Sequence, residues 1–434
     1  MSRFPALRLR RAGGLLDLPW ELPLADWPAN LQFRILPVGP SRHLVRFLLV
    51  DGGLIALKEE PDIVAEREYA VLNHLERADL PAVTPIGIAR RAEERTAILV
   101  TEYLASSLQF RRLLSRFPLG PGAYRDRLLD AMAWLLVDLH RGGVYWGDCS
   151  LANTLFRRDG DRIQAFLVDA ETSEVHPQLS DGQRAYDLEI LVENVGYGLA
   201  DVAMLQERPE DLDDAAAAAD NVRERYEAIW RELHFEPRLP IGDRHAIRSR
   251  LRRLNELGFA VDEIEIVPAG SGSDVRLRVT TSNRAFHAHE LERLAGIRAL
   301  EGQARLLLND MREHVAWLRL HASGSISEQE AAAIWRRDVL EPTLQRLEPM
   351  IAGRDPIQAY CDVLEHKWLL SERAKRDVGL EAAIKAYLAE GAPAPEVPPA
   401  SEAMDSAAPA DVAAVEAELE AARTGAKDGL ADGV

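Results

Sequence analysis

Two acidic side chains and an amide follow one another at short spacing in the first half of the chain. Asp148 and Asn153 are five residues apart in WGDCSLANTLF, and Asp169 comes 16 residues later, after the apolar run AFLV. Carboxylate and amide oxygens are ligands that Mg²⁺ accepts, and a carboxylate can also orient an attacking hydroxyl. The pattern predicts a phosphoryl-transfer site with Asp148 as the base and Asn153 and Asp169 as metal ligands.

A lysine and a glutamate upstream complete this set. Lys58 lies in the strand-like run LIALKEE, and Glu68 follows ten residues later on a predicted helix. A strand lysine of this kind holds the α- and β-phosphates of ATP when a helix carboxylate fixes it. We expect Lys58 to pair with Glu68, and Glu66 is the competing partner, because a lysine that points into a fold needs one.

The elements that must position these residues follow from the hydrophobic pattern. LQFRILPV, HLVRFLLV and LIALKEE are predicted strands, and a tight turn at Asp51–Gly53 joins the last two. Residues 62–77 read as an amphipathic helix, residues 83–91 and 96–104 as strands, and residues 124–143 as a long helix. Strands first and helices second predict an α+β fold with an antiparallel-sheet N-lobe and a helical C-lobe.

The runs GPSRH, ALKEE, EREY, WGDCSLANTLFRRDG, VDAET and LSDGQRAYDLEI together resemble a bacterial family of unknown function described as lipopolysaccharide-kinase-like. The resemblance extends from residue 30 to about residue 390. It implies a protein-kinase-like fold for the first half and a second, uncharacterised domain after it. The spacing of Asp148 and Asn153 is also that of the kinase catalytic loop HRDxxxxN.

The phosphate-binding loop departs from the kinase pattern. The glycine-rich loop is reduced to Gly39 within PVGPSRH, and Pro40 has no N–H group to offer a phosphate. We expect Ser41 and Arg42, together with His43, to supply side-chain contacts in its place.

ATP and Mg²⁺ are the expected cofactors, with a hydroxyl-bearing acceptor as the second substrate. Adenine is expected to pair with backbone groups at the hinge formed by Glu102 to Leu104. The segment between Asp169 and the helix expected from about Gln183 is short and has no APE motif. A sugar, lipid or small-molecule hydroxyl is therefore favoured over a protein side chain as acceptor.

Two substitutions favour an alternative function. Trp146 stands where the catalytic-loop histidine is expected, and Glu171 replaces the glycine of DFG. A nucleotide-binding pseudokinase that acts as a regulator or scaffold is consistent with both. Each site residue also has a structural explanation: Asp148 as a turn cap, Asn153 and Asp169 as makers of ordinary loop hydrogen bonds, and Glu171 as a surface residue instead of a further metal ligand.

Several other residues are interpreted as structural. His140 ends a long apolar helix, Asp187 is expected to brace the catalytic loop, and Cys149 is expected to be an inert thiol. An i, i+4, i+8 stripe of cations is expected to be a solvated helix face, with anion or partner binding as the alternative: Arg244, Arg248 and Arg252.

The bulk composition excludes several classes of protein. The chain has 434 residues and a formal net charge of -18, so its surface repels phosphate backbones and nucleic acid is not an expected partner. Two cysteines far apart give no disulfide framework or zinc site. No run is long enough for a transmembrane helix and the N-terminus lacks a signal-peptide core, so we expect a cytoplasmic protein.

The chain is expected to contain several segments. The predicted segments are an N-terminal arm (1–30), the N-lobe (31–104), the C-lobe (105–235), an α-rich second domain with a small β element (236–390) and a disordered acidic Ala/Pro-rich tail (391–434). A protein partner is expected to bind, if at all, through the second domain or the tail.

Overall fold

The structure is a computed structural model, and the chain in it divides into two compact units. Among the described residues, unit 1 contains those up to 157 and 164–223, and unit 2 contains 158–163 and 224–393. The described residues are 6–11, 13–36, 42–114, 123–240, 243–268, 274–321, 327–351 and 354–393.

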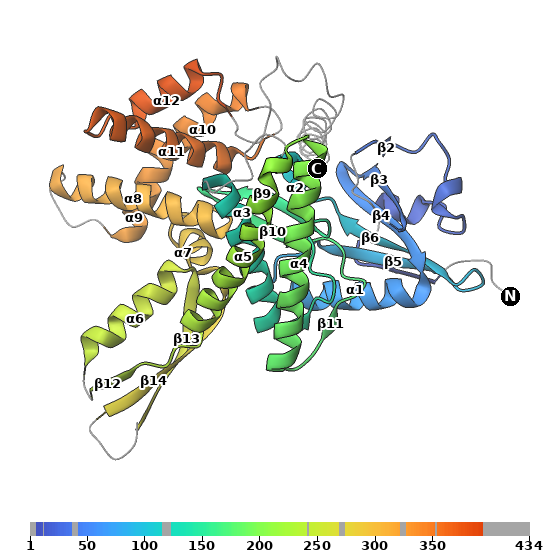
Figure 1. Cartoon of the computed structure of the whole chain (residues 1–434). Coiled ribbons are helices and arrows are strands. Elements are labelled where there is room, and N and C mark those ends of the chain that lie inside the picture. The colour runs from blue at the N-terminus through green and yellow to red at the C-terminus, as the bar shows by residue number, and fades with distance from the viewer. Residues whose placement is uncertain are drawn as a thin grey trace. The chain divides into compact units, whose positions relative to one another are not determined.

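Unit 1 begins with an antiparallel sheet whose strands lie in the order β1-β5-β6-β4-β3-β2 (Figure 1). The predicted hairpin is present: Asp51 and Gly52 both have positive φ, at 50° and 74°, which suits the two-residue turns that match strand twist. The strands are β1 (Ala6–Leu9), β2 (Phe33–Arg34), β3 (Leu44–Val50), β4 (Gly53–Pro61), β5 (Pro85–Arg91) and β6 (Thr96–Glu102).

The first predicted strand is shorter than expected. Among the described residues of LQFRILPV, only Phe33 and Arg34 pair with β3. Ile35 and Leu36 follow without strand pairing. Residues 37–41 lie outside the described residues.

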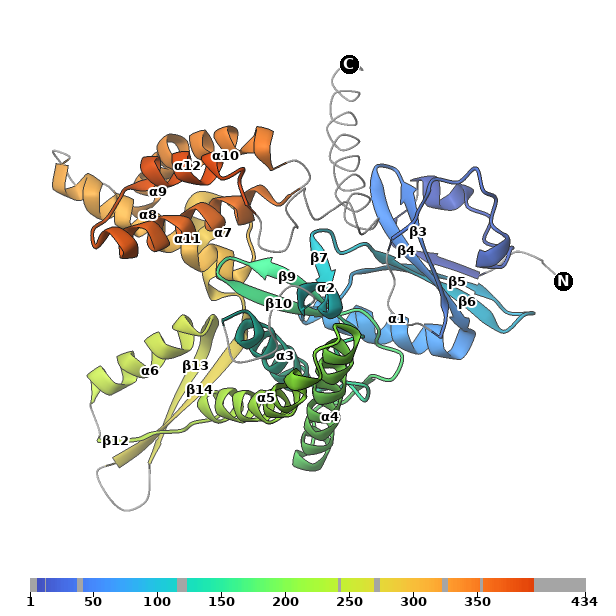
Figure 2. The ribbon, with the colours of Figure 1, turned by 45° about the horizontal axis from the view of Figure 1, so that its top comes forward.

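Helix α1 (Asp62–Arg77) has the bounds predicted for it and packs against β5 (Figures 1 and 2). Its apolar face is buried, as the helical spacing of those positions requires. That face carries Ala65, Tyr69, Leu72 and Leu75.

The N-terminal arm places its tryptophans in the core of the sheet. Trp20 and Trp27 are 2% and 4% exposed, and their rings meet edge to face with centroids 5.3 Å apart. The Trp20 indole N–H donates to the carbonyl oxygen of Leu15 at 2.7 Å, so the buried ring keeps its hydrogen bond. Two short 3₁₀ turns lie in the arm: η1 (Gly13–Asp17) precedes Trp20, and η2 (Leu24–Asp26) lies between Trp20 and Trp27.

The second part of unit 1 is mostly helical. α4 starts at a capping box in which Ser180 and Gln183 satisfy each other's backbone N–H groups. Its helices are α2 (Phe110–Leu114), α3 (Ala123–Arg141), α4 (Asp181–Leu205), the 3₁₀ turn η3 (Pro209–Asp211) and α5 (Leu212–Leu233), which continues into unit 2. Short strands accompany them: β7 (Ser107–Gln109), β8 (Val144–Tyr145), β9 (Thr154–Asp159), β10 (Arg162–Leu167) and β11 (Glu174–Val175). The end of β9 and the start of β10, residues 158–163, belong to unit 2.

Unit 2 joins a small sheet to a group of helices. The two strands predicted here are longer than expected, and they pair with each other along most of their length. The elements are β12 (Arg238–Pro240), α6 (Arg244–Glu256), β13 (Phe259–Pro268), β14 (Asp274–Arg284), α7 (Phe286–Ala295), α8 (Glu301–His321), α9 (Glu328–Trp335), the π-helical turn η4 (Arg336–Leu340), α10 (Glu341–Leu347), η5 (Glu348–Met350), α11 (Pro356–Ala374) and α12 (Leu380–Ala389).

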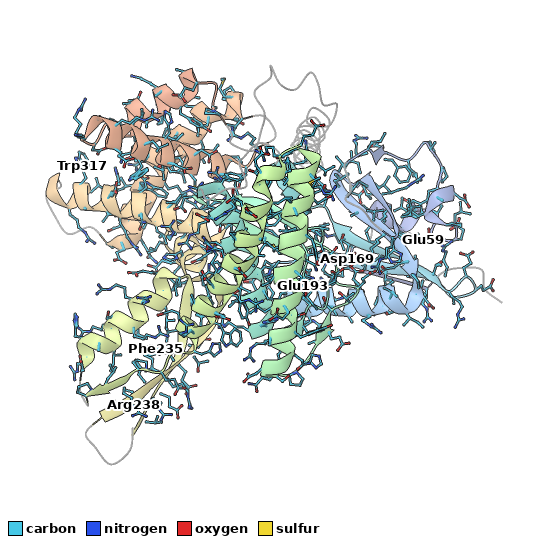
Figure 3. All side chains as sticks on the ribbon, viewed as in Figure 1. Glu59, Asp169, Glu193, Phe235, Arg238 and Trp317 are labelled. Atoms are coloured by element: carbon cyan, nitrogen blue, oxygen red, sulfur yellow. The ribbon has the colours of Figure 1, made fainter. Side chains whose placement is uncertain are left out.

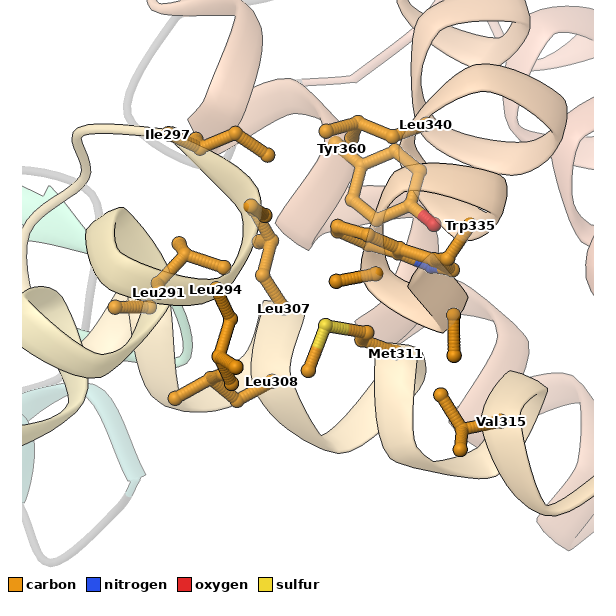
Figure 4. Close-up of a cluster of buried hydrophobic side chains, with 14 of the residues drawn as sticks. Leu291, Leu294, Ile297, Leu307, Leu308, Met311, Val315, Trp335, Leu340 and Tyr360 are labelled. Carbon is orange, nitrogen blue, oxygen red and sulfur yellow. The ribbon is translucent and has the colours of Figure 1, made fainter. Parts of the chain in front are cut away.

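The helices of unit 2 share a hydrophobic core of their own. Trp335 and Tyr360 are fully buried, and both donate hydrogen bonds to the carboxylate of Asp310, each at 2.7 Å. Figure 4 shows these two rings packed with Met311 and the leucines of α7 and α8. The side chains of Arg244, Arg248 and Arg252 are exposed on α6.

The order of the elements confirms the predicted α+β fold, with an antiparallel sheet first and helices after it.

Candidate active site

Lys58 lies at the centre of a charged cluster in unit 1. Its Nζ donates to Glu68 Oε2 at 2.8 Å and to Asp169 Oδ1 at 3.1 Å. Glu68 comes from α1, is 1% exposed and also accepts the backbone N–H of Ala170 at 3.1 Å. Glu66 instead pairs with Arg8 at 2.7 Å, so the helix carboxylate next to the lysine is Glu68.

Two further carboxylates approach the same lysine. Glu60 Oε2 lies 3.0 Å and Glu171 Oε2 lies 3.8 Å from Lys58 Nζ. Burial opposes the charged lysine, but coulombic attraction to Glu68, Asp169 and Glu60 raises the pKa of Lys58 above its ordinary value. Burial, with the nearby charge of Glu68, raises the pKa of Glu60 to about 8. The cluster therefore contains more acid than the one lysine neutralises.

The loop between β8 and β9 brings Asp148 and Asn153 together. Asn153 Nδ2 donates to Asp148 Oδ2 at 3.0 Å and to the Asp148 carbonyl oxygen at 3.3 Å. Gly147, just before Asp148, has a φ of 81°, and a Cβ there would meet the carbonyl oxygen of Thr172 at 2.8 Å. Only glycine fits this position of the loop without strain.

Asp187 holds the loop from α4, in the bracing position expected from the sequence. Its carboxylate accepts the backbone N–H groups of Trp146 at 2.7 Å and Gly147 at 2.9 Å, and lies 3.1 Å from His140 Nε2. Burial lowers the pKa of His140. Burial raises the pKa of the Cys149 thiol, which disfavours the reactive thiolate. These groups shape the loop from within the core.

A cavity of about 200 Å³ opens beside the charged cluster. Leu36, Val45 and Leu99 are among the apolar side chains that line it. The predicted site residues on its wall are Lys58, Glu68, Glu102, Leu104, Asn153 and Asp169. An apolar cavity with a few convergent polar groups is the usual form of a small-ligand site.

The hinge end of this cavity offers a backbone donor. The N–H of Glu102 donates to Thr84 and that of Tyr103 to Leu54, at 2.8 and 3.1 Å. Within the residues that the structure describes, the N–H of Leu104 makes no such bond. Leu104 can therefore donate to a flat heterocycle.

The remaining predicted site residues do not line the cavity or lie outside the described residues. Asp148 does not line the cavity but is hydrogen bonded to Asn153, which does. The Arg42 side chain is 85% exposed and lies 4.0 Å from Glu171, away from the cavity wall. Gly39 and Ser41 lie outside the described residues. Asp169 follows the end of β10 and is labelled in Figure 3.

Sequence reasoning missed Glu60 as part of this cluster. Alternate residues of a strand share a face, so Lys58 and Glu60 on β4 point the same way. A second charged residue on the inward face of a strand was the signal that could have revealed it. The inward direction itself becomes known only once α1 covers that face.

Comparison with known proteins agrees with the predicted resemblance. Residues 57–207 match the lipopolysaccharide kinase (Kdo/WaaP) family, and residues 228–391 match a domain of unknown function (DUF4032). One similar solved structure is described as WaaP in complex with acyl carrier protein, with 20% identity, 45% of this chain and 90% of that chain covered, and a TM-score of 0.30. A search of curated proteins found no match.

The helices that the structure describes include none long and apolar enough to cross a bilayer.

The matched segment 57–207 contains Lys58, Asp148, Asn153 and Asp169. The helices of unit 2 lie in the segment that matches DUF4032. The chain therefore carries a segment similar to the lipopolysaccharide kinase (Kdo/WaaP) family, followed by a segment similar to the DUF4032 domain family.

Proposed function

We propose that residues 31–235 form an ATP- and Mg²⁺-dependent phosphotransferase whose acceptor is a non-protein hydroxyl, in the class of sugars, lipids or small molecules. The observation that carries the proposal is the contact of Lys58 with both Glu68 and Asp169 on the wall of a cavity that Asn153 also lines. The match of residues 57–207 to a lipopolysaccharide kinase family supports a sugar acceptor.

The residues present suit a metal-bound triphosphate. Asn153 uses its Nδ2 group to hold Asp148, and no hydrogen bond within the described chain occupies its Oδ1 atom. Asp169 Oδ1 is held by Lys58 and by the N–H of Glu171, which leaves Oδ2 for a cation. When bound, Mg·ATP supplies the phosphoryl group and part of the positive charge that stabilises its transfer.

Each protein group then has a role. Lys58, fixed by Glu68, would neutralise phosphate oxygens, and Asn153 and Asp169 would hold the metal. Asp148, oriented by Asn153, accepts the proton of the acceptor hydroxyl as its oxygen bonds to phosphorus. The bond from that phosphorus to the bridging oxygen breaks, and the electron pair leaves with ADP.

The chain after Asp169 supports a small acceptor. Only Ala170 to Ser180 separate this acid from α4, and the strand β11 within them pairs with β8. So short a segment offers little platform for docking a peptide in extended form.

The experiment that tests the proposal uses the full chain with Mg·ATP labelled on the γ-phosphate and a panel of sugar, lipid A-like and small polyol acceptors. We expect transfer of label to one acceptor class, and its loss in D148N and N153A. Glu66→Gln is the matched control, because this residue lies on α1 but pairs with Arg8 outside the cluster. Transfer that persists in D148N would overturn the assignment.

A pseudokinase is the second candidate, and a specific observation favours it. Trp146 is fully buried in the position of the catalytic-loop histidine, with no hydrogen bond to its indole N–H among the described residues. Mg·ATP that raises the thermal midpoint while no acceptor is phosphorylated and ATP is not hydrolysed would support this function over the first.

A further inference from the structure

A histidine and two glutamates from three segments meet at the edge of the charged cluster in unit 1. His43 precedes β3, Glu60 lies near the end of β4, and Glu171 follows β10. One ligand atom of each lies within 4.8 Å of the others. His43 Nε2 is 3.1 Å from Glu171 Oε2 and 4.0 Å from Glu60 Oε2.

Burial makes this set different from a surface group of acids. The side chain of Glu60 is fully buried, and those of His43 and Glu171 are 19% and 18% exposed. Ligands around one small cation lie roughly 3–4 Å apart at typical metal–ligand distances of about 2.1 Å. Small side-chain rotations would therefore bring all three donors to one ion.

Glu60 supplies the second, independent observation. Neither of its carboxylate oxygens has a hydrogen-bond partner among the described residues. Its Oε2 forms an ion pair with Lys58 Nζ at 3.0 Å, and it shares that ammonium group with Glu68 and Asp169. A buried charged carboxylate is costly, and a bound cation is one form of compensation for it.

The charges around Lys58 lead to the same conclusion. In the part of the chain that the structure describes, four carboxylates lie within 4.0 Å of the Lys58 ammonium group. Arg42 lies 4.0 Å from Glu171, but its side chain is exposed to solvent, which screens its charge. A divalent ion on the side of Glu60 and Glu171 would reduce this excess. Lys58 would keep its bonds to Glu68 and Asp169.

We propose that His43, Glu60 and Glu171 bind one first-row divalent transition-metal ion, Mn²⁺ or Zn²⁺, without any nucleotide. One imidazole nitrogen with two carboxylates suits these ions better than Mg²⁺, which prefers oxygen ligands alone. The site differs from the pair Asn153 and Asp169, assigned above to the nucleotide's metal. In sequence, His43 comes three residues after Pro40, which offers no N–H group to a phosphate.

The test is metal binding by the chelator-treated full chain in the absence of nucleotide. Free Mn²⁺ is followed by electron paramagnetic resonance, and Zn²⁺ by competition with a chromophoric chelator. We expect one equivalent of metal to bind, and His43→Asn and Glu60→Gln each to weaken binding at least about tenfold. His245→Asn, an exposed histidine of α6, is the matched control and should bind as the wild type does.

Two further variants keep the result interpretable. Asn153→Ala should leave this nucleotide-free binding unchanged, although it removes phosphoryl transfer under the proposed function. Loss of binding in Asn153→Ala, or equal binding by the wild type and Glu60→Gln, would overturn the site. If Glu60→Gln fails to fold by circular dichroism, His43→Asn decides alone, because its side chain lies outside a strand and is partly exposed.

Discussion

Two buried charged clusters, one in each unit, differ in how their charges are balanced. In unit 2 the carboxylate of Asp362 is held by Arg158 at 3.0 Å, Arg354 at 2.8 Å and the amide of Gln358 at 2.9 Å. Two arginines there face Asp362, and one of them, Arg158, also pairs with Glu365 at 3.2 Å. In unit 1 a single lysine faces several acids, and Glu60 keeps two oxygens without hydrogen bonds among the described residues.

The contrast distinguishes a structural cluster from a functional one. A buried carboxylate with both oxygens paired holds segments together and needs nothing more. An acidic cluster on a cavity wall, with too little positive charge of its own, is suited to a ligand that brings positive charge with it. We infer binding for the cluster at Lys58 and a purely structural role for that at Asp362.

The largest effect is expected from Asp169→Ala. Removing this acid takes away a metal ligand and a partner of Lys58, so turnover with any verified acceptor should fall at least about a thousandfold. The thermal midpoint should change little, since Asp169 lies on a cavity wall and is 28% exposed. Initial rates and thermal unfolding measure the two quantities, and near-normal rates in this variant would contradict the functional reading of the cluster.

Asp362→Ala should act on stability. The change leaves Arg158 and Arg354 without their shared buried acid, and we expect the free energy of unfolding to fall by about 3–5 kcal/mol. Chemical denaturation measures it. Glu341→Ala, which removes an exposed pair with Arg336, is the control and should cost less than about 1 kcal/mol. An equal loss in the two variants would show that the buried network is not structural.

Glu68→Gln should weaken catalysis without abolishing it. The amide keeps the shape of the side chain but loses the charge that fixes Lys58, so kcat/KM should fall by about a hundredfold. Glu66→Gln on the same helix should stay within about twofold of the wild type, given its exposed partner Arg8. Steady-state kinetics of the pair decide whether position on α1 or contact with Lys58 matters.

The smallest effect concerns the two thiols, one in each unit. Burial raises the pKa of Cys149 and of Cys361 well above that of a free thiol, so little thiolate exists at pH 8 in the folded protein. Both should react with a disulfide reagent only after denaturation, and raising the pH to 9 should change the native rate little. Rapid labelling of the native protein would show that one of the two is exposed.

Much of this arrangement was determined by local sequence alone. The period of apolar residues specified α1 to its first and last residue, and the run Asp51–Gly53 specified the turn before β4. The run LIALKEE and the helix after it likewise predicted the pair of Lys58 and Glu68, ten residues apart. These features depend on neighbours in the chain, so their signals are present in short windows.

The tertiary structure alone decided which carboxylates share Lys58. Glu60 and Glu66 are both charged residues near the lysine in sequence, yet one is buried beside it and the other pairs with Arg8 at the surface. The meeting of His43 with Glu171, 128 residues apart, likewise follows from packing. Contacts of this kind depend on how sheet and helices pack against each other, and no short window of sequence specifies that.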